Sequence, residues 1–133
     1  MTDFLLTLHS IVRWVIMGTA LAAVLRFGLG WRRGGPFSPM DNGLTAGFSG
    51  LMDFQVLLGL VYLFWAGFAG EGFAPFRIQH AITMILAAVA AHLPSRWKKE
   101  TDKIRYRNSL FAILGSLMLV VVGVAALPQG WFG

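Results

Sequence analysis

Residues Ser109 to Leu127 read SLFAILGSLMLVVVGVAAL, a run of about nineteen residues without a charged side chain. An α-helix rises about 1.5 Å per residue, so a run of this length crosses a hydrocarbon layer of about 30 Å. Inside a bilayer no water satisfies the backbone amides and carbonyls, and a helix satisfies them internally. The run therefore predicts a membrane-spanning helix, and we expect Asn108 to cap its beginning.

Three other segments are equally long and apolar, and they run from about Phe4 to Leu25, from Leu44 to Phe68 and from Pro75 to Leu93. Short connectors that contain glycine or proline separate them. The sequence thus predicts an all-α integral membrane protein, in which residues 1–133 form one domain. Its helices lie at about 4–25, 44–68, 75–93 and 109–127 and make a four-helix transmembrane bundle.

The composition agrees with this prediction. Hydrophobic residues make up 56% of the chain and charged residues 13%, about half of the charged share of a soluble domain. Such figures exclude intrinsic disorder, which needs low hydrophobicity and high net charge. The chain has no cysteine, which excludes disulfide scaffolds, thiolate zinc sites, iron–sulfur clusters ligated by cysteine and c-type haem attachment.

The basic residues are distributed unevenly along the chain. Of the 11 Lys and Arg residues, nine lie in two connectors, at 26–33 and 96–107. Clusters of this kind mark cytoplasmic loops, so we expect both chain termini on the periplasmic side of a bacterial inner membrane. The positive charges follow the first helix, which predicts a retained helix and not a signal peptide. Nucleic-acid binding is not expected, because the charges determine topology.

Two histidines are the most informative polar residues of the predicted helices. His9 and His80 each lie about five residues inside a helix that starts on the periplasmic side, and so at the same depth. Two neutral imidazoles in a bundle are suited to axial ligation of a b-type haem. Arg13 shares a helix face with His9 and would bind a haem propionate or a quinone oxygen. The alternative is that both histidines are hydrogen-bonded interfacial residues.

Arg13 and Asp53 are a second pair of ionisable residues inside predicted helices. Residue counts from the periplasmic face to Arg13 and from the cytoplasmic face to Asp53 place both at similar depths in the membrane. We therefore expect a structural ion pair between the first two helices. A proton or quinone role for Asp53 is the alternative. Gln55 lies about 200° away from Asp53 on its helix and shares a face with Gly59 and Tyr62.

His92 lies near the cytoplasmic end of the third helix. The chain has three histidines, so none is left to complete a second pair with His92. We expect a solvated interfacial residue, with quinone contact or proton entry as the alternative.

The chain contains the stretch LHSIVRW at residues 8–14, then a Gly/Pro loop that ends in Asp41-Asn42, and later the stretch QHAITMILAAVAAH at residues 79–92. A Lys/Arg-rich connector precedes the last helix. In these features the chain resembles a family of small four-helix bacterial membrane proteins that are sometimes labelled cytochrome-b-like. The resemblance implies that His9, Arg13, His80 and His92 are characteristic polar positions. Gln79 stands where an acidic residue is expected.

These features predict a membrane electron-transfer protein with one haem b held by His9 and His80, which exchanges electrons with quinone or with a larger redox complex. The alternative is a structural accessory subunit of a respiratory or photosynthetic membrane complex. A quinone-binding module without haem is a third hypothesis. Under each hypothesis we expect the lipid bilayer and other membrane subunits as partners. No phosphate-binding loop, metalloprotease motif or nucleophile elbow is present.

Overall fold

The computed structural model describes residues 2–131, and these residues form helices and no strand. The four long helices are α1 (Thr2–Arg33), α2 (Pro39–Ala66), α3 (Pro75–Ala91) and α4 (Asp102–Ala125). A π-helical turn (Gly67–Glu71) follows α2, and a short 3₁₀ helix (Leu93–Trp97) follows α3. Four helical segments, some of which include these short turns, are long and apolar enough to cross a membrane: Thr2–Arg33, Pro39–Glu71, Pro75–Trp97 and Asp102–Ala125. The chain is therefore a four-helix protein of the multi-pass membrane type.

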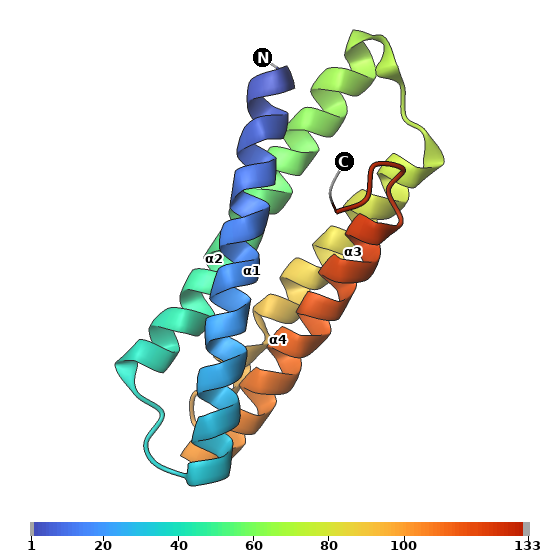
Figure 1. Cartoon of the computed structure of the whole chain (residues 1–133). Helices are drawn as coiled ribbons and strands as arrows, with labels where there is room; N and C mark the ends of the chain where they lie inside the picture. The colour runs from blue at the N-terminus through green and yellow to red at the C-terminus, as the bar shows by residue number, and fades with distance from the viewer. Residues whose placement is uncertain (1, 132–133) are drawn as a thin grey trace.

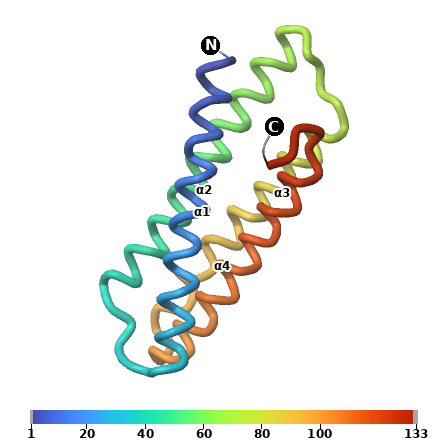
Figure 2. Tube along the Cα trace, viewed as in Figure 1, coloured from blue at the N-terminus to red at the C-terminus, as the bar shows by residue number. Residues whose placement is uncertain are grey.

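The helices form an antiparallel bundle (Figure 1). Each helix packs against its neighbour in the chain, and α4 also packs against α1, so that α1 and α3 are diagonal in the bundle. Both ends of the described chain lie at the end of the bundle that holds residues 67–74, whereas residues 34–38 and 92–101 lie at the opposite end. The Cα trace shows the α1–α2 and α3–α4 hairpins separating toward the chain termini (Figure 2).

Local sequence signals explain where the helices start and end. At the start of α2, the Ser38 side chain accepts a hydrogen bond from the Asp41 amide, and the Asp41 side chain accepts one from the Ser38 amide. Pro39 occupies the first turn of α2, where its missing amide hydrogen costs nothing. The chain leaves α1 through Gly34 and Gly35, whose φ values of 78° and 104° favour glycine.

Three helices extend beyond their apolar runs at the basic end. The first continues to Arg33 and the second begins at Pro39. The last begins at Asp102, with the Thr101 hydroxyl accepting a hydrogen bond from the Ile104 amide. The prediction that Asn108 caps the last helix is therefore wrong. A helix does not need to stop at the edge of the apolar layer, because water satisfies its polar side chains beyond that edge.

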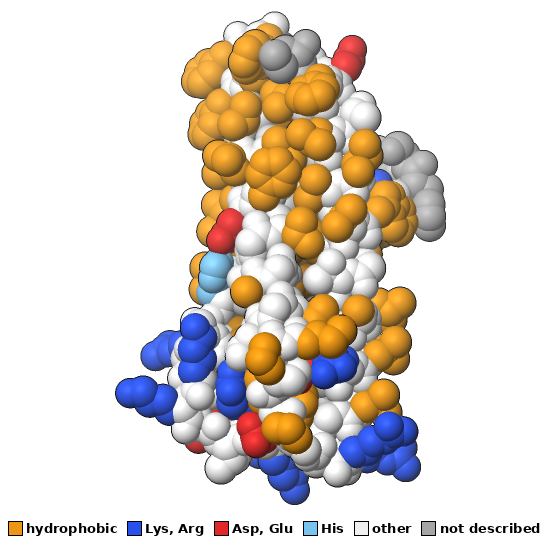
Figure 3. Space-filling view, turned by 90° about the vertical axis from the view of Figure 1, so that its left-hand side faces the viewer, with side chains coloured by type: hydrophobic (Ala, Val, Ile, Leu, Met, Phe, Trp, Pro, Cys, Tyr) orange, Lys and Arg blue, Asp and Glu red, His pale blue; other side chains and the backbone are white. Residues whose placement is uncertain are grey.

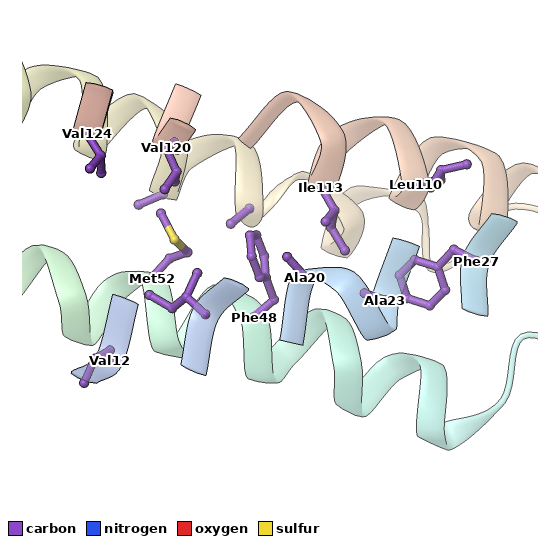
Figure 4. Close-up of a cluster of buried hydrophobic side chains, with 14 of the residues drawn as sticks. Val12, Ala20, Ala23, Phe27, Phe48, Met52, Leu110, Ile113, Val120 and Val124 are labelled. Carbon is purple, nitrogen blue, oxygen red and sulfur yellow. The ribbon is translucent and has the colours of Figure 1, made fainter. Parts of the chain in front are cut away.

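Buried apolar side chains from all four helices form the core along the bundle, and Figure 4 shows part of it. Its largest fully buried apolar side chains are Phe27, Phe48, Met52 and Ile113. Buried alanines, among them Ala87, let the helices approach closely, and the Ser116 hydroxyl donates to the Ala87 carbonyl at 2.8 Å. Many large apolar side chains point outward, which suits a lipid environment, whereas Lys and Arg side chains gather at the lower end in Figure 3.

A buried polar cluster holds the basic end together. Asp41 has no exposed surface, and its carboxylate pairs with the Arg26 guanidinium. The same carboxylate accepts from the Ser38 hydroxyl at 2.9 Å and lies 2.8 Å from the Tyr106 hydroxyl. This hydroxyl is also 2.7 Å from the Pro36 carbonyl oxygen. The cluster thus connects α1, the 34–38 loop, α2 and α4.

Candidate cofactor-binding cavity

A cavity of about 510 Å³ lies between the helices in the half of the bundle near the chain termini. This volume falls within the range of small-molecule pockets. All four helices and the C-terminal turn contribute to the lining, which is largely apolar. The basic residues that line it are His9, Arg13, Arg77 and His80. The cavity thus brings together the three residues that the sequence singled out for a cofactor, and adds Arg77.

The hydrogen bond of His80 determines which of its ring nitrogens carries the proton. Nδ1 of His80 lies 3.0 Å from the carbonyl oxygen of Gly123. Since a carbonyl oxygen only accepts, Nδ1 is the donor, and Nε2 of the neutral ring keeps a free lone pair. Gly123 lies in the last turn of α4, where helix carbonyls lack intrahelical partners. A histidine with this arrangement is oriented as metal-ligating histidines are.

Gly123 is also the point of close approach between α3 and α4. A Cβ atom at this position would collide with the terminal methyl group of Met84 and lie 3.1 Å from Cγ2 of Thr83. The absence of a side chain therefore lets α3 come close enough for His80 to reach the Gly123 carbonyl.

His9 has the opposite arrangement. The side-chain nitrogen Nε2 of Gln55 lies 2.8 Å from the His9 carbonyl oxygen and 3.1 Å from the His9 ring nitrogen Nδ1. An amide nitrogen only donates, so Nδ1 of His9 accepts and its Nε2 carries the hydrogen when the ring is neutral. This Nε2 lies 3.1 Å from the position that a Cβ atom would take at Gly59. The two histidines of the cavity therefore differ at Nε2: this nitrogen is a hydrogen-bond acceptor in His80 and a hydrogen-bond donor in His9.

The two arginines have unused hydrogen-bonding capacity. Arg13 donates to the Trp131 carbonyl oxygen at 3.3 Å, and its guanidinium carbon lies 5.3 Å and 5.4 Å from the ring centres of Trp14 and Trp131. Nε of Arg13 and Nη1 of Arg77 are buried without a hydrogen-bond partner among the described residues. Nη2 of Arg77 lies 3.8 Å from a carboxylate oxygen of Glu71. Since buried donors are normally satisfied, these atoms are available to a bound water or to a ligand that carries acceptors.

The structure does not form the predicted ion pair between Arg13 and Asp53. Arg13 faces the cavity together with His9, whereas Asp53 pairs with Nε2 of His92 at 2.8 Å. Both side chains of that pair are about half exposed, 54% for Asp53 and 50% for His92. The depth count gave similar heights for Arg13 and Asp53, but it did not specify the direction in which each side chain leaves its helix.

The face assigned to Gln55, Gly59 and Tyr62 does line the cavity, and Asp53 does not. Sequence reasoning missed the C-terminal turn, in which residues 127–129 line the cavity. It also missed the packing of Trp131, whose ring centre lies 5.8 Å from that of Trp14. No periodic pattern signals a turn that follows the last helix, so its return toward α1 could not be read from the sequence.

Comparison of the chain with protein-family models, with curated proteins and with solved structures gives no match.

Proposed function

We propose that this chain is a membrane-embedded electron-transfer protein that binds one haem b in the cavity between its four helices. The observation that carries the proposal is His80, whose Nδ1 is engaged by the Gly123 carbonyl, so that Nε2 is free to ligate iron. Arg13 and Arg77, with their unpartnered donors, suit the two propionates. His80 and both arginines thus fit the group, whereas the hydrogen on Nε2 of His9 does not suit a second axial ligand.

The chain supplies binding, orientation and environment, and haem supplies a one-electron couple when bound. Apolar residues such as Ile16, Met52 and Val120 line the cavity beside the basic residues. The guanidinium groups of Arg13 and Arg77 would balance the negative charges of the propionates in this low-dielectric environment.

The proposed orientation places the basic end in the cytoplasm and the chain termini on the periplasmic side of a bacterial inner membrane. Lys and Arg gather at one end of the molecule, and the cavity lies toward the other. The cavity would therefore lie in the periplasmic half of the membrane. Electrons would pass to quinone or to other membrane subunits of a redox complex.

The reduced-minus-oxidised absorption spectrum of the purified protein tests the proposal. We expect b-type bands in the wild-type protein, their loss in His80→Ala and their retention in His92→Ala. His92 is a matched control because it lies outside the cavity lining. The absence of b-type bands in a folded wild-type protein purified from haem-replete cells would refute the proposal.

A quinone site without haem is the second candidate. It is favoured by the donor set of the cavity, in which His9 Nε2 and the two guanidinium groups would donate to quinone carbonyl oxygens. Extraction of purified protein with organic solvent would then yield quinone at a fixed ratio to the chain, and no haem. Co-purification with a redox complex at fixed stoichiometry, without either cofactor, would favour the accessory-subunit alternative.

A further inference from the structure

We propose that His80 is the sole histidine ligand of the haem, and that His9 donates its Nε2 hydrogen to a small diatomic ligand such as dioxygen. This inference rests on the proposed haem site. It adds the binding of a small external molecule to the proposed one-electron chemistry.

The first argument is the difference between the two rings. The Gly123 carbonyl makes Nδ1 of His80 the donor, which leaves a lone pair on Nε2. The Gln55 amide makes Nδ1 of His9 the acceptor, which leaves a hydrogen on Nε2. Ligation of iron needs a lone pair, so the rings are not equivalent as ligands.

The second argument is that the backbone determines the orientation of Gln55. The same amide nitrogen donates to Nδ1 of His9 and, at 2.8 Å, to the His9 carbonyl oxygen. If the amide were turned by 180°, its oxygen would face that carbonyl oxygen, and two acceptors would oppose each other. The His9 tautomer therefore follows from a backbone acceptor that does not change.

The third argument is the position of the two rings. His9 projects from α1 and His80 from α3, and these two helices are diagonal in the bundle, so the cavity that both rings line extends between them. Gly59 leaves room for the His9 ring, whose Nε2 lies 3.1 Å from the place of a Cβ atom at that position. With one histidine ligand, the iron keeps an open position. The hydrogen-bond donors near such a position decide between ligand binding and electron transfer.

The test uses purified, haem-containing protein and measures spin state and carbon monoxide binding. We expect a high-spin ferric spectrum in the wild-type protein and rapid binding of carbon monoxide after reduction. His9→Ala should keep its haem, should show a higher carbon monoxide stretching frequency and should release dioxygen about tenfold faster, as expected for one lost hydrogen bond. His92→Ala is the control and should match the wild type in each measurement.

Gln55→Met provides a second variant of similar size. It removes the amide nitrogen that makes Nδ1 of His9 an acceptor, so the ring is free to take the other tautomer and to present the Nε2 lone pair. We expect a shift of the ferric spectrum from high to low spin. A low-spin wild-type spectrum, no carbon monoxide binding and loss of haem in His9→Ala would together overturn the inference while leaving the haem site intact. Absence of haem from the wild-type protein would overturn the proposed function, and the inference with it.

Discussion

The side-chain amide of Gln55 lies 2.8 Å from the carbonyl oxygen of His9 and 3.1 Å from its ring nitrogen Nδ1. One side chain on α2 thus positions both the ring and the backbone of a residue on α1. This contact gives His9 a donor function, while the Gly123 carbonyl gives His80 an acceptor function. The chemistry of the cavity depends on these two contacts.

Gly59→Ala should disturb the cavity through His9. The new Cβ atom would lie 3.1 Å from Nε2 of His9, so the ring must shift by a few tenths of an ångström. Since the ring carries the donor Nε2, we expect the haem-containing variant to release dioxygen up to about tenfold faster, equivalent to about 1.4 kcal/mol, while it keeps its haem. Gly50→Ala is the matched control, because nothing lies within 4 Å of a Cβ atom at that position. Equal effects of the two substitutions would contradict the role given to Gly59.

Tyr106→Phe should destabilise the basic end of the bundle. The variant removes the hydroxyl that lies 2.8 Å from the Asp41 carboxylate and 2.7 Å from the Pro36 carbonyl. We expect the free energy of unfolding in detergent to fall by about 1–3 kcal/mol, since buried acceptors lose a donor. The control is Tyr62→Phe, whose hydroxyl has no hydrogen bond within the described part of the chain. An unchanged unfolding curve for Tyr106→Phe would show that this hydroxyl contributes nothing.

The pair of Asp53 and His92 should contribute little to stability in detergent. Both side chains are about half exposed, so solvent screens their attraction. In a double-mutant cycle with Asp53→Asn and His92→Gln we expect a coupling energy below about 1 kcal/mol. Neither variant should lose haem. A coupling of several kcal/mol would mean that the pair is shielded from solvent in the purified protein.

Cysteine labelling should determine the orientation in the membrane. The chain has no cysteine, so a maleimide reacts only with the one cysteine that is introduced. Glu71→Cys, at the end with the chain termini, should react with a membrane-impermeant maleimide added to intact cells. Ser95→Cys, at the basic end, should react only after the membrane is permeabilised. The reverse pattern would invert the proposed orientation.

The number of helices could be predicted because each apolar run alone is long enough to cross a bilayer. The cavity residues His9, His80 and Arg13 stood out because ionisable side chains are rare in such runs. The structure places all three at the lining of one cavity. How far each helix extends beyond its apolar run could not be predicted, because a helix with polar side chains is also stable outside the membrane, in contact with water.

What the sequence could not provide is the direction of each side chain around its helix relative to the other helices. Residue counting placed Arg13 and Asp53 at similar depths, yet Asp53 faces His92 instead. The opposite tautomers of His9 and His80 depend on Gln55 and Gly123, which lie 46 and 43 positions away in the chain. Contacts at that separation follow from the packing of the whole bundle and not from a local pattern.

The most direct test of the central claim is the haem content of the purified wild-type protein, measured by the pyridine haemochrome assay against protein concentration. The account predicts about one haem b per chain, which is retained in His92→Ala and lost in His80→Ala. A folded wild-type protein without haem, isolated from haem-replete cells, would contradict it.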